Sequence, residues 1–257
     1  MNALRHIGYM TVRDLRALWR QPWYVVATLV QPVIWLLLFG ELFKRVADLP
    51  GFGDESYIAY LAPGVVIMSA LFSSGWNGMA TIEEINRGVT DRLLVSPVRR
   101  GAVIAGRVVQ SAIVIVIQSV IMVGIALAVG ATFPGGVVGV LVLILVSALL
   151  GACFATLSNS LALMTRQEES LIGAVTLLVL PLTFLSTALM TSDLLPGWMK
   201  TVSDVNPVDW AIEAGRSATA ASTDWALVAR DAGLLALLLA VCATLAAQAF
   251  RSYQRSI

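Results

Sequence analysis

The sequence is poor in charge and in chemically reactive side chains. Charged residues make up 13% of its 257 positions and hydrophobic residues 58%, whereas a soluble domain carries about 25% charged residues. The single histidine, His6, leaves little from which to build a Ser-His-Asp triad. The two cysteines, Cys153 and Cys242, both lie in apolar runs, which argues against a disulfide framework or a zinc site. This composition favours an integral membrane protein.

Nucleotide-binding motifs are also missing. The sequence contains no Gly-x-x-x-x-Gly-Lys-Ser/Thr loop, and its only lysines are Lys44 and Lys200. Thr201 follows Lys200, but Met199 stands where the loop needs glycine. The formal net charge of +1 provides no basic field for a nucleic-acid partner. We therefore expect no cofactor or metal in this chain, no nucleic acid, and no enzyme activity of its own.

Long apolar runs dominate what is present. Residues 108–165 contain no Asp, Glu, Lys or Arg, and as one helix they would be about 87 Å long, against a hydrocarbon core of about 30 Å. The stretch must fold back, and Phe133-Pro134-Gly135-Gly136 is the expected turn. With four further apolar runs, this predicts an all-α integral membrane protein with six transmembrane helices, at residues 22–44, 58–82, 103–129, 137–164, 171–190 and 225–250.

The distribution of charge predicts the orientation. If the N-terminus is cytoplasmic, 12 basic and 6 acidic residues lie inside, and 5 basic and 10 acidic residues lie outside. Basic residues concentrate on the cytoplasmic side of membrane proteins. We therefore expect a multi-pass protein with both termini in the cytoplasm.

Residues 1–21 are predicted to form an amphipathic helix rather than a signal peptide. Arg5, Arg13, Arg16 and Arg20 fall on one side of a helical projection, opposite a leucine-rich side. Such a helix lies in the membrane interface, with its arginines facing lipid phosphate and cytosol. It serves either as a plain surface anchor or as a lever that joins the membrane part to a cytosolic partner.

The predicted spans hold few polar residues and lack a carboxylate at mid-membrane depth, which argues against an ion-coupled carrier. The polar residues that they do contain are glutamines and asparagines, for which hydrogen bonding between helices is the commoner role. The alternative is a polar lining of a substrate route. The candidate residues for that route are Gln31, Phe72, Asn77, Gln118 and Phe184.

The segment 81–100, between the second and third spans, has mixed charge and is expected on the cytosolic side. Gly88 can end the incoming helix, and Thr90 can cap a new one with Asp91 in its first turn. The apolar side and the end of this short helix come from Leu93, Leu94 and Pro97. A capped amphipathic helix of this kind suits docking against a soluble protein. An ordinary loop held by lipid phosphates is the alternative.

The spacing Glu84-x-x-x-Gly88-x-x-x-x-Leu93-x-x-x-Pro97 resembles the cytosolic signature of ABC-2 type transporter permeases. The similarity covers almost the whole chain, including an outer stretch with Leu195-Pro196-Gly197-Trp198 and Asn206-Pro207. The pattern is most similar to the drug-exporter branch typified by daunorubicin-resistance permeases. The sequence departs from the family at Glu83, where many relatives place a basic residue, and at Gly88-Val89-Thr90, where Gly-Thr-Leu is more usual.

This resemblance implies the ABC-2 (type V exporter) fold in a bacterial cytoplasmic (inner) membrane. It also implies a separate P-loop ATPase in two copies, which would bind ATP and Mg, and a second permease copy that is identical or related. The ATPase would dock on the segment 81–100 and on the N-terminal helix. The docking residues expected from the family are Glu84, Gly88, Asp91, Arg92, Leu93, Leu94 and Pro97, together with Arg13 and Arg16.

The outer segment 191–224 is rich in helix breakers and in acidic residues. In the family this region forms short re-entrant helices between spans five and six that cap the exit. A solvated loop with an interfacial anchor is the alternative, because Trp198 and its apolar neighbours could also rest in the outer leaflet.

The expected function is therefore that of the membrane-spanning permease subunit of an ATP-driven exporter. Its substrates would be amphiphilic molecules such as drugs, antibiotics, lipids or glycolipids. An ATP-independent secondary carrier or channel is the alternative, and it would need coupling groups inside the membrane. A membrane enzyme is disfavoured because the only candidate nucleophilic groups are His6 and the two membrane-buried cysteines.

Overall fold

The computed structural model describes residues 8–9, 11–13, 15–16, 22–43, 57–88, 100–189 and 195–255, and this part of the chain is helical with short connections. Along the chain, the first of these helices are α2 (Pro22–Leu42), α3 (Tyr57–Gly75), α4 (Asn77–Asn86) and α6 (Arg100–Ala128). They are followed by α7 (Gly136–Thr165), α8 (Glu168–Phe184), α9 (Gly197–Ser203), α10 (Pro207–Thr219) and α11 (Trp225–Arg255). The described residues of the expected N-terminal helix, at 8–9, 11–13 and 15–16, are helical.

The turn between α6 and α7 lies where proline and glycine predict it. Gly130 and Gly136 adopt positive φ angles of 100° and 62°, which glycine reaches without steric strain. The N–H of Gly135 donates to the carbonyl of Thr219 at 2.9 Å, so the turn is fastened to the end of α10. A Cβ atom at Gly139 would lie 2.2 Å from the carbonyl oxygen of Ala218, so α7 and α10 approach too closely there for any larger residue.

The second predicted span, 58–82, is longer in the structure and is interrupted. α3 ends at Gly75 and α4 begins at Asn77, with Trp76 as its N-cap. α4 then continues to Asn86, into the first residues of the predicted cytosolic segment. Gly88 follows with a φ of 66°, so the helix ends where glycine permits the left-handed conformation.

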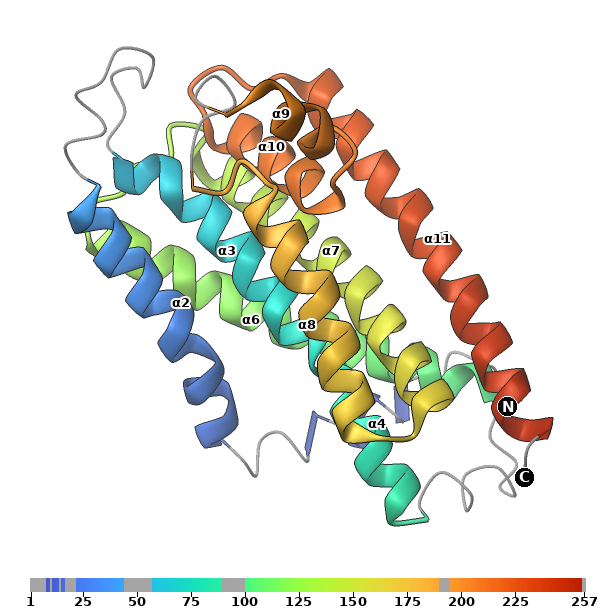
Figure 1. The fold of residues 1–257 in the computed structure, drawn as a ribbon. Coiled ribbons are helices and arrows are strands. Elements are labelled where there is room, and N and C mark those ends of the chain that lie inside the picture. The colour runs from blue at the N-terminus through green and yellow to red at the C-terminus, as the bar shows by residue number, and fades with distance from the viewer. Residues whose placement is uncertain are drawn as a thin grey trace.

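Helix α7 occupies the centre of the bundle, packed against α3, α6, α10 and α11 (Figure 1). The short helices α9 and α10 lie at one end of the bundle, and α4 lies at the other, together with the last turns of α11 (Figure 1). These are called here the α10 end and the α4 end. The largest fully buried side chains include Leu61, Ile67, Leu143, Leu150 and Leu235.

Among the residues that the structure describes, four helices are long and apolar enough to cross a membrane, at Tyr57–Asn86, Ala105–Ala128, Gly136–Thr165 and Trp225–Phe250. The first predicted span corresponds to α2, whose apolar stretch is Val26–Leu42. The fifth, predicted at 171–190, overlaps the 17-residue α8, which begins at Glu168 and already ends at Phe184. Large apolar side chains such as Leu141, Leu177 and Leu237 are exposed on the bundle surface. Such an outer surface is favourable in contact with lipid and unfavourable in water.

Candidate functional site

A carboxylate at the α4 end joins three segments of the chain. Arg13 Nη2 donates to Glu84 Oε1 at 3.0 Å, and Arg107 Nη2 donates to Glu84 Oε2. Glu84 lies on α4, Arg107 near the start of α6, and Arg13 on the N-terminal segment. Thr11 Oγ1 also donates to the carbonyl of Gly106 at 3.2 Å, which places the N-terminal segment against α6. Glu84 and Arg13, both predicted as docking residues, are thus in direct contact.

The same cluster continues into the bundle. Arg107 Nη1 donates to Thr81 Oγ1, and Thr81 Oγ1 donates to Asn159 Oδ1 on α7. Asn159 Nδ2 donates to Asn77 Oδ1 at 3.0 Å and to the carbonyl of Ala155 at 2.7 Å. Thr81 and Asn159 are almost completely buried. A polar network therefore runs from the N-terminal segment to the central helix.

Of the other predicted docking residues, the structure describes only Gly88 and Arg16. Gly88 closes α4, and Arg16 is exposed on the N-terminal segment. The remaining predicted docking residues lie outside the described part of the chain: Asp91, Arg92, Leu93, Leu94 and Pro97.

The predicted substrate-path residues do not form one site. Gln31 and Phe72 line a groove between α2 and α3 that also includes Thr28 and Trp35. Gln118 is buried beside it and donates to Thr28 Oγ1 at 2.9 Å. The groove has a volume of about 30 Å³, room for about two water molecules, so in this conformation it is too small for an amphiphile.

The other two candidates lie elsewhere. Asn77 belongs to the network at the α4 end, and Phe184 is exposed at the last turn of α8. Gln118 and Asn77 do make hydrogen bonds between helices, which was the commoner of the two roles expected for them.

At the α10 end, buried polar side chains fasten the outer helices to the bundle. Asp209 Oδ1 accepts hydrogen bonds from the N–H and the hydroxyl of Thr187, at 2.7 and 2.5 Å. Asn206 caps α10 by accepting from the N–H of Val208 at 2.9 Å, and its amide donates to the carbonyls of Leu182 and Leu185 at 2.8 and 3.0 Å. The Asn-Pro pair of the sequence therefore starts α10 and satisfies the open carbonyls at the end of α8.

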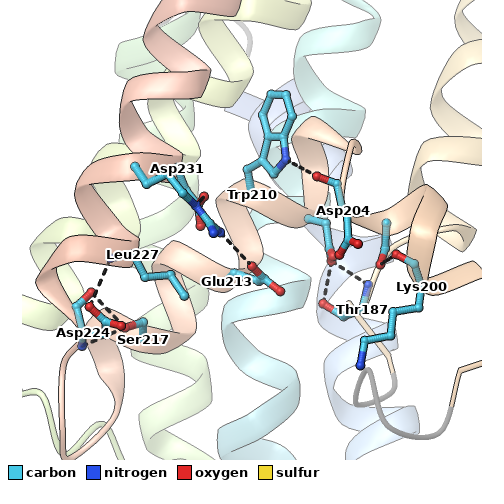
Figure 2. Close-up of polar contacts among 12 residues, drawn as sticks. Thr187, Lys200, Asp204, Trp210, Glu213, Ser217, Asp224, Leu227 and Asp231 are labelled. Carbon is cyan, nitrogen blue, oxygen red and sulfur yellow. Dashed lines mark hydrogen bonds and ion pairs between the residues drawn. The ribbon is translucent and has the colours of Figure 1, made fainter.

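A cavity of about 420 Å³ lies between α9, α10 and α11, with Asp204, Asp209, Glu213 and Arg230 among its lining residues. Figure 2 shows Trp210 donating its indole N–H to the carbonyl of Asp204, at 2.8 Å. Burial is the main cause that raises the pKa of Glu213 above its ordinary value of 4.5, with Asp209 and Asp231 adding to it.

Asp231 on α11 is fully buried. Its Oδ1 accepts from Arg230 Nε at 2.8 Å, and Arg230 also lies 3.6 Å from Glu213 Oε2. Arg107, Arg216 and Asp209 were not predicted as site residues, and Asn206 was noted only for its family likeness. Their one available signal was charge or amide character at the edge of an apolar or amphipathic run.

The sequence profile of the ABC-2 type transporter family matches residues 5–219. This chain belongs to the ABC-2 type transporter family. It is 28% identical over 230 residues to the daunorubicin resistance ABC transporter permease protein DrrB1 of Streptomyces coeruleorubidus, covering 88% of this chain and 80% of that protein. It is 27% identical over 246 residues to the inner membrane transport permease YadH of Escherichia coli K12, covering 93% and 91%. As an ABC-2 permease with several apolar helices, it is a multi-pass membrane protein.

Proposed function

We propose that this ABC-2 family member is the membrane-spanning subunit of an exporter that uses ATP hydrolysed by a separate P-loop ATPase, which would hold ATP and Mg. The observation that supports this most directly is the family match over residues 5–219. The absence of a Walker-type loop from the sequence agrees with ATP being bound and hydrolysed by another chain. Two ATPase copies would act on a pair of permeases, either identical or related.

The α4 end is the proposed docking site. Glu84 and Arg13, in contact with each other, would face the ATPase together with Gly88, Arg16 and the residues 91–97. In this proposal ATP binding favours one of two arrangements of the docking segment, and the bundle shifts between an inward-open and an outward-open state.

The proposed topology has six spans, with α2 and α8 as the first and fifth, and both termini in the cytoplasm. The α4 end is then cytosolic and the α10 end is outer, where α9 and α10 would cap the exit as short re-entrant helices. The whole of residues 1–257 would form one transmembrane domain. The membrane would be the bacterial inner membrane, as the name of the Escherichia coli relative suggests.

The proposed substrates are amphiphilic molecules such as drugs, antibiotics, lipids or glycolipids. The name of the Streptomyces relative makes daunorubicin the first probe to use. The proposed route passes between α2 and α3, beside Gln31 and Phe72, and it must widen from the present groove of about 30 Å³. Gln118 would line the same route from α6.

Transport in proteoliposomes tests this function. The chain is reconstituted with a P-loop ATPase captured by co-purification, and daunorubicin fluorescence is followed after addition of ATP. We expect uptake into inside-out vesicles that requires ATP and that stops when the ATPase's P-loop lysine is replaced. Uptake that ignores ATP but collapses with the proton gradient would contradict the proposal.

That contrary outcome corresponds to a second candidate function, a secondary carrier. The buried carboxylate of Asp231 is the one observation that favours it, because ion-coupled carriers hold ionisable groups within the membrane. Its ion pair with Arg230 already neutralises it. An Asp231→Asn variant would abolish transport by a carrier coupled through this group, whereas an ATP-driven permease would keep its dependence on ATP.

A further inference from the structure

The side chain of Arg107, on α6, makes two hydrogen bonds to helix α4. Its Nη1 donates to Thr81 and its Nη2 to Glu84, two residues one turn apart on α4. The Arg107 side chain is 11% exposed, and the residue is almost entirely buried. A guanidinium has its donors in a rigid planar fork, so one side chain can hold two acceptors in fixed relative positions.

The contact of Arg107 with Thr81 extends to the centre of the protein. The hydroxyl of Thr81 donates a hydrogen bond to Asn159 Oδ1 on α7, and the backbone N–H of Gly78 donates to Ser158 Oγ at 2.9 Å. A Cβ atom at Gly78 would lie 2.5 Å from the carbonyl oxygen of Ser158, so α4 and α7 touch backbone to backbone. A rigid contact of this kind transmits a displacement of α4 to α7.

Because the charge of Arg107 is buried, its position depends on its two acceptors, Thr81 and Glu84. Arg107 is held in a largely desolvated position, where a guanidinium without its acceptors is strongly unfavourable. The Glu84 side chain is 26% exposed and binds Arg13 with its other oxygen. Any movement of Glu84 away from Arg107 is therefore resisted, and α4 responds as a unit with the start of α6.

We infer that Arg107 is a positioning residue that couples the ATPase-docking residue Glu84 to the central helix α7 through Thr81 and Asn159. This inference rests on the proposed function, because it assigns the path by which docking reaches the membrane. α7 packs on α10 at the opposite end, so a displacement at Glu84 reaches the outer helices through one element. The N-terminal segment moves with Glu84 through Arg13.

Two variants separate coupling from folding. Arg107→Lys keeps the charge but cannot span both acceptors, and Thr81→Val removes only the hydroxyl that links Arg107 with Asn159. Thr81→Ser is the conservative variant that restores the hydroxyl. Arg166→Lys is the matched control, because Arg166 is an exposed arginine at the end of α7, outside the predicted docking segment.

The measurement is the number of daunorubicin molecules transported per ATP hydrolysed, with the complex reconstituted in proteoliposomes, alongside its thermal unfolding. We expect Arg107→Lys and Thr81→Val to keep the ATPase bound and hydrolysing, and to lower the transport ratio about fivefold or more. Thr81→Ser and Arg166→Lys should keep the wild-type ratio.

An unchanged ratio in Thr81→Val, with or without a lower unfolding temperature, would overturn the coupling role and leave a purely structural one. If Arg107→Lys fails to fold, the comparison of Thr81→Val with Thr81→Ser decides alone. A wild-type complex that shows no ATP-driven transport would instead overturn the proposed function, and this inference with it.

Discussion

The guanidinium carbon of Arg216 lies 3.7 Å from the centre of the Tyr60 ring. The same guanidinium donates to the carbonyl of Ala188 at 2.9 Å and to the carbonyl of Tyr60 at 3.3 Å. One side chain therefore joins α10 to α3 and to the segment that follows α8. Burial lowers the pKa of Arg216 below its ordinary value, while Tyr60 and Asp209 oppose that shift.

Replacing Arg216 should loosen the α10 end. Arg216→Ala leaves buried carbonyls without a donor and removes the cation from the ring, which together should lower the free energy of unfolding by about 2 kcal/mol or more. Thermal unfolding in detergent measures this, with Lys200→Ala as the exposed control from the same end. Equal unfolding temperatures for the two variants would show that Arg216 does not hold α10 in place.

A methyl group at Gly78 should destabilise the contact between α4 and α7. The added Cβ would lie 2.5 Å from a backbone oxygen that cannot move away easily, and overpacking of this kind costs about 1–3 kcal/mol. Gly124→Ala is the control, because nothing lies within 4 Å of a Cβ atom there. It should be neutral or slightly stabilising through helix propensity. A stable Gly78→Ala variant would contradict the close approach.

Stability should depend on pH through Glu213. Burial, and then Asp209 and Asp231, raise the pKa of this carboxyl above 4.5. The folded protein therefore binds the proton more tightly than the unfolded chain, so stability is lost as the pH rises from 4.5 through the raised pKa. Glu213→Gln should be more stable than wild type above that window and should lose the advantage below it. Unfolding temperatures of both proteins between about pH 4 and pH 8 test this, and a constant difference would contradict it.

Gly88 should tolerate only residues that accept a positive φ. Its φ is 66° and nothing lies within 4 Å of a Cβ atom, so backbone strain and not space decides the outcome. Gly88→Val should misdirect the docking segment and reduce ATP-driven transport about tenfold, since the left-handed conformation costs a residue with a Cβ about 1–2 kcal/mol. Gly88→Asn, which tolerates that conformation, is the control. Full transport by a Gly88→Val, Leu93→Asp double variant would show that the docking assignment is wrong.

The proposed orientation predicts which surface cysteines a membrane-impermeant maleimide reaches. Cys153 and Cys242 are both buried, so the background should be low. Ser222→Cys, exposed between α10 and α11, should react in intact cells, and Glu169→Cys, exposed at the start of α8, only after permeabilisation. The reverse pattern would invert the topology.

Local sequence signals predicted several features because each depends on neighbouring residues alone. The turn near Pro134 follows from the conformational limits of proline and glycine, and the end of α4 follows from Gly88. The capping of α10 by Asn206 lies within the Asn-Pro pair that was noted for its family likeness, although its capping role was not predicted.

The pairing of distant residues could not be predicted from the same patterns. Thr81 and Asn159 are 78 positions apart, and Tyr60 and Arg216 are 156 apart. Periodicity shows which face of a helix is apolar but not which helix it meets, so Arg107 resembled any basic residue at a membrane boundary.

The most direct test of the central claim is ATP hydrolysis by the purified components. The chain alone, a P-loop ATPase captured by co-purification, and the two together are measured in lipid nanodiscs, with and without daunorubicin. We expect no hydrolysis by the chain alone and hydrolysis by the complex that changes when daunorubicin is added. Hydrolysis by this chain alone, or a complex whose hydrolysis is identical to that of the isolated ATPase with and without the drug, would contradict the account.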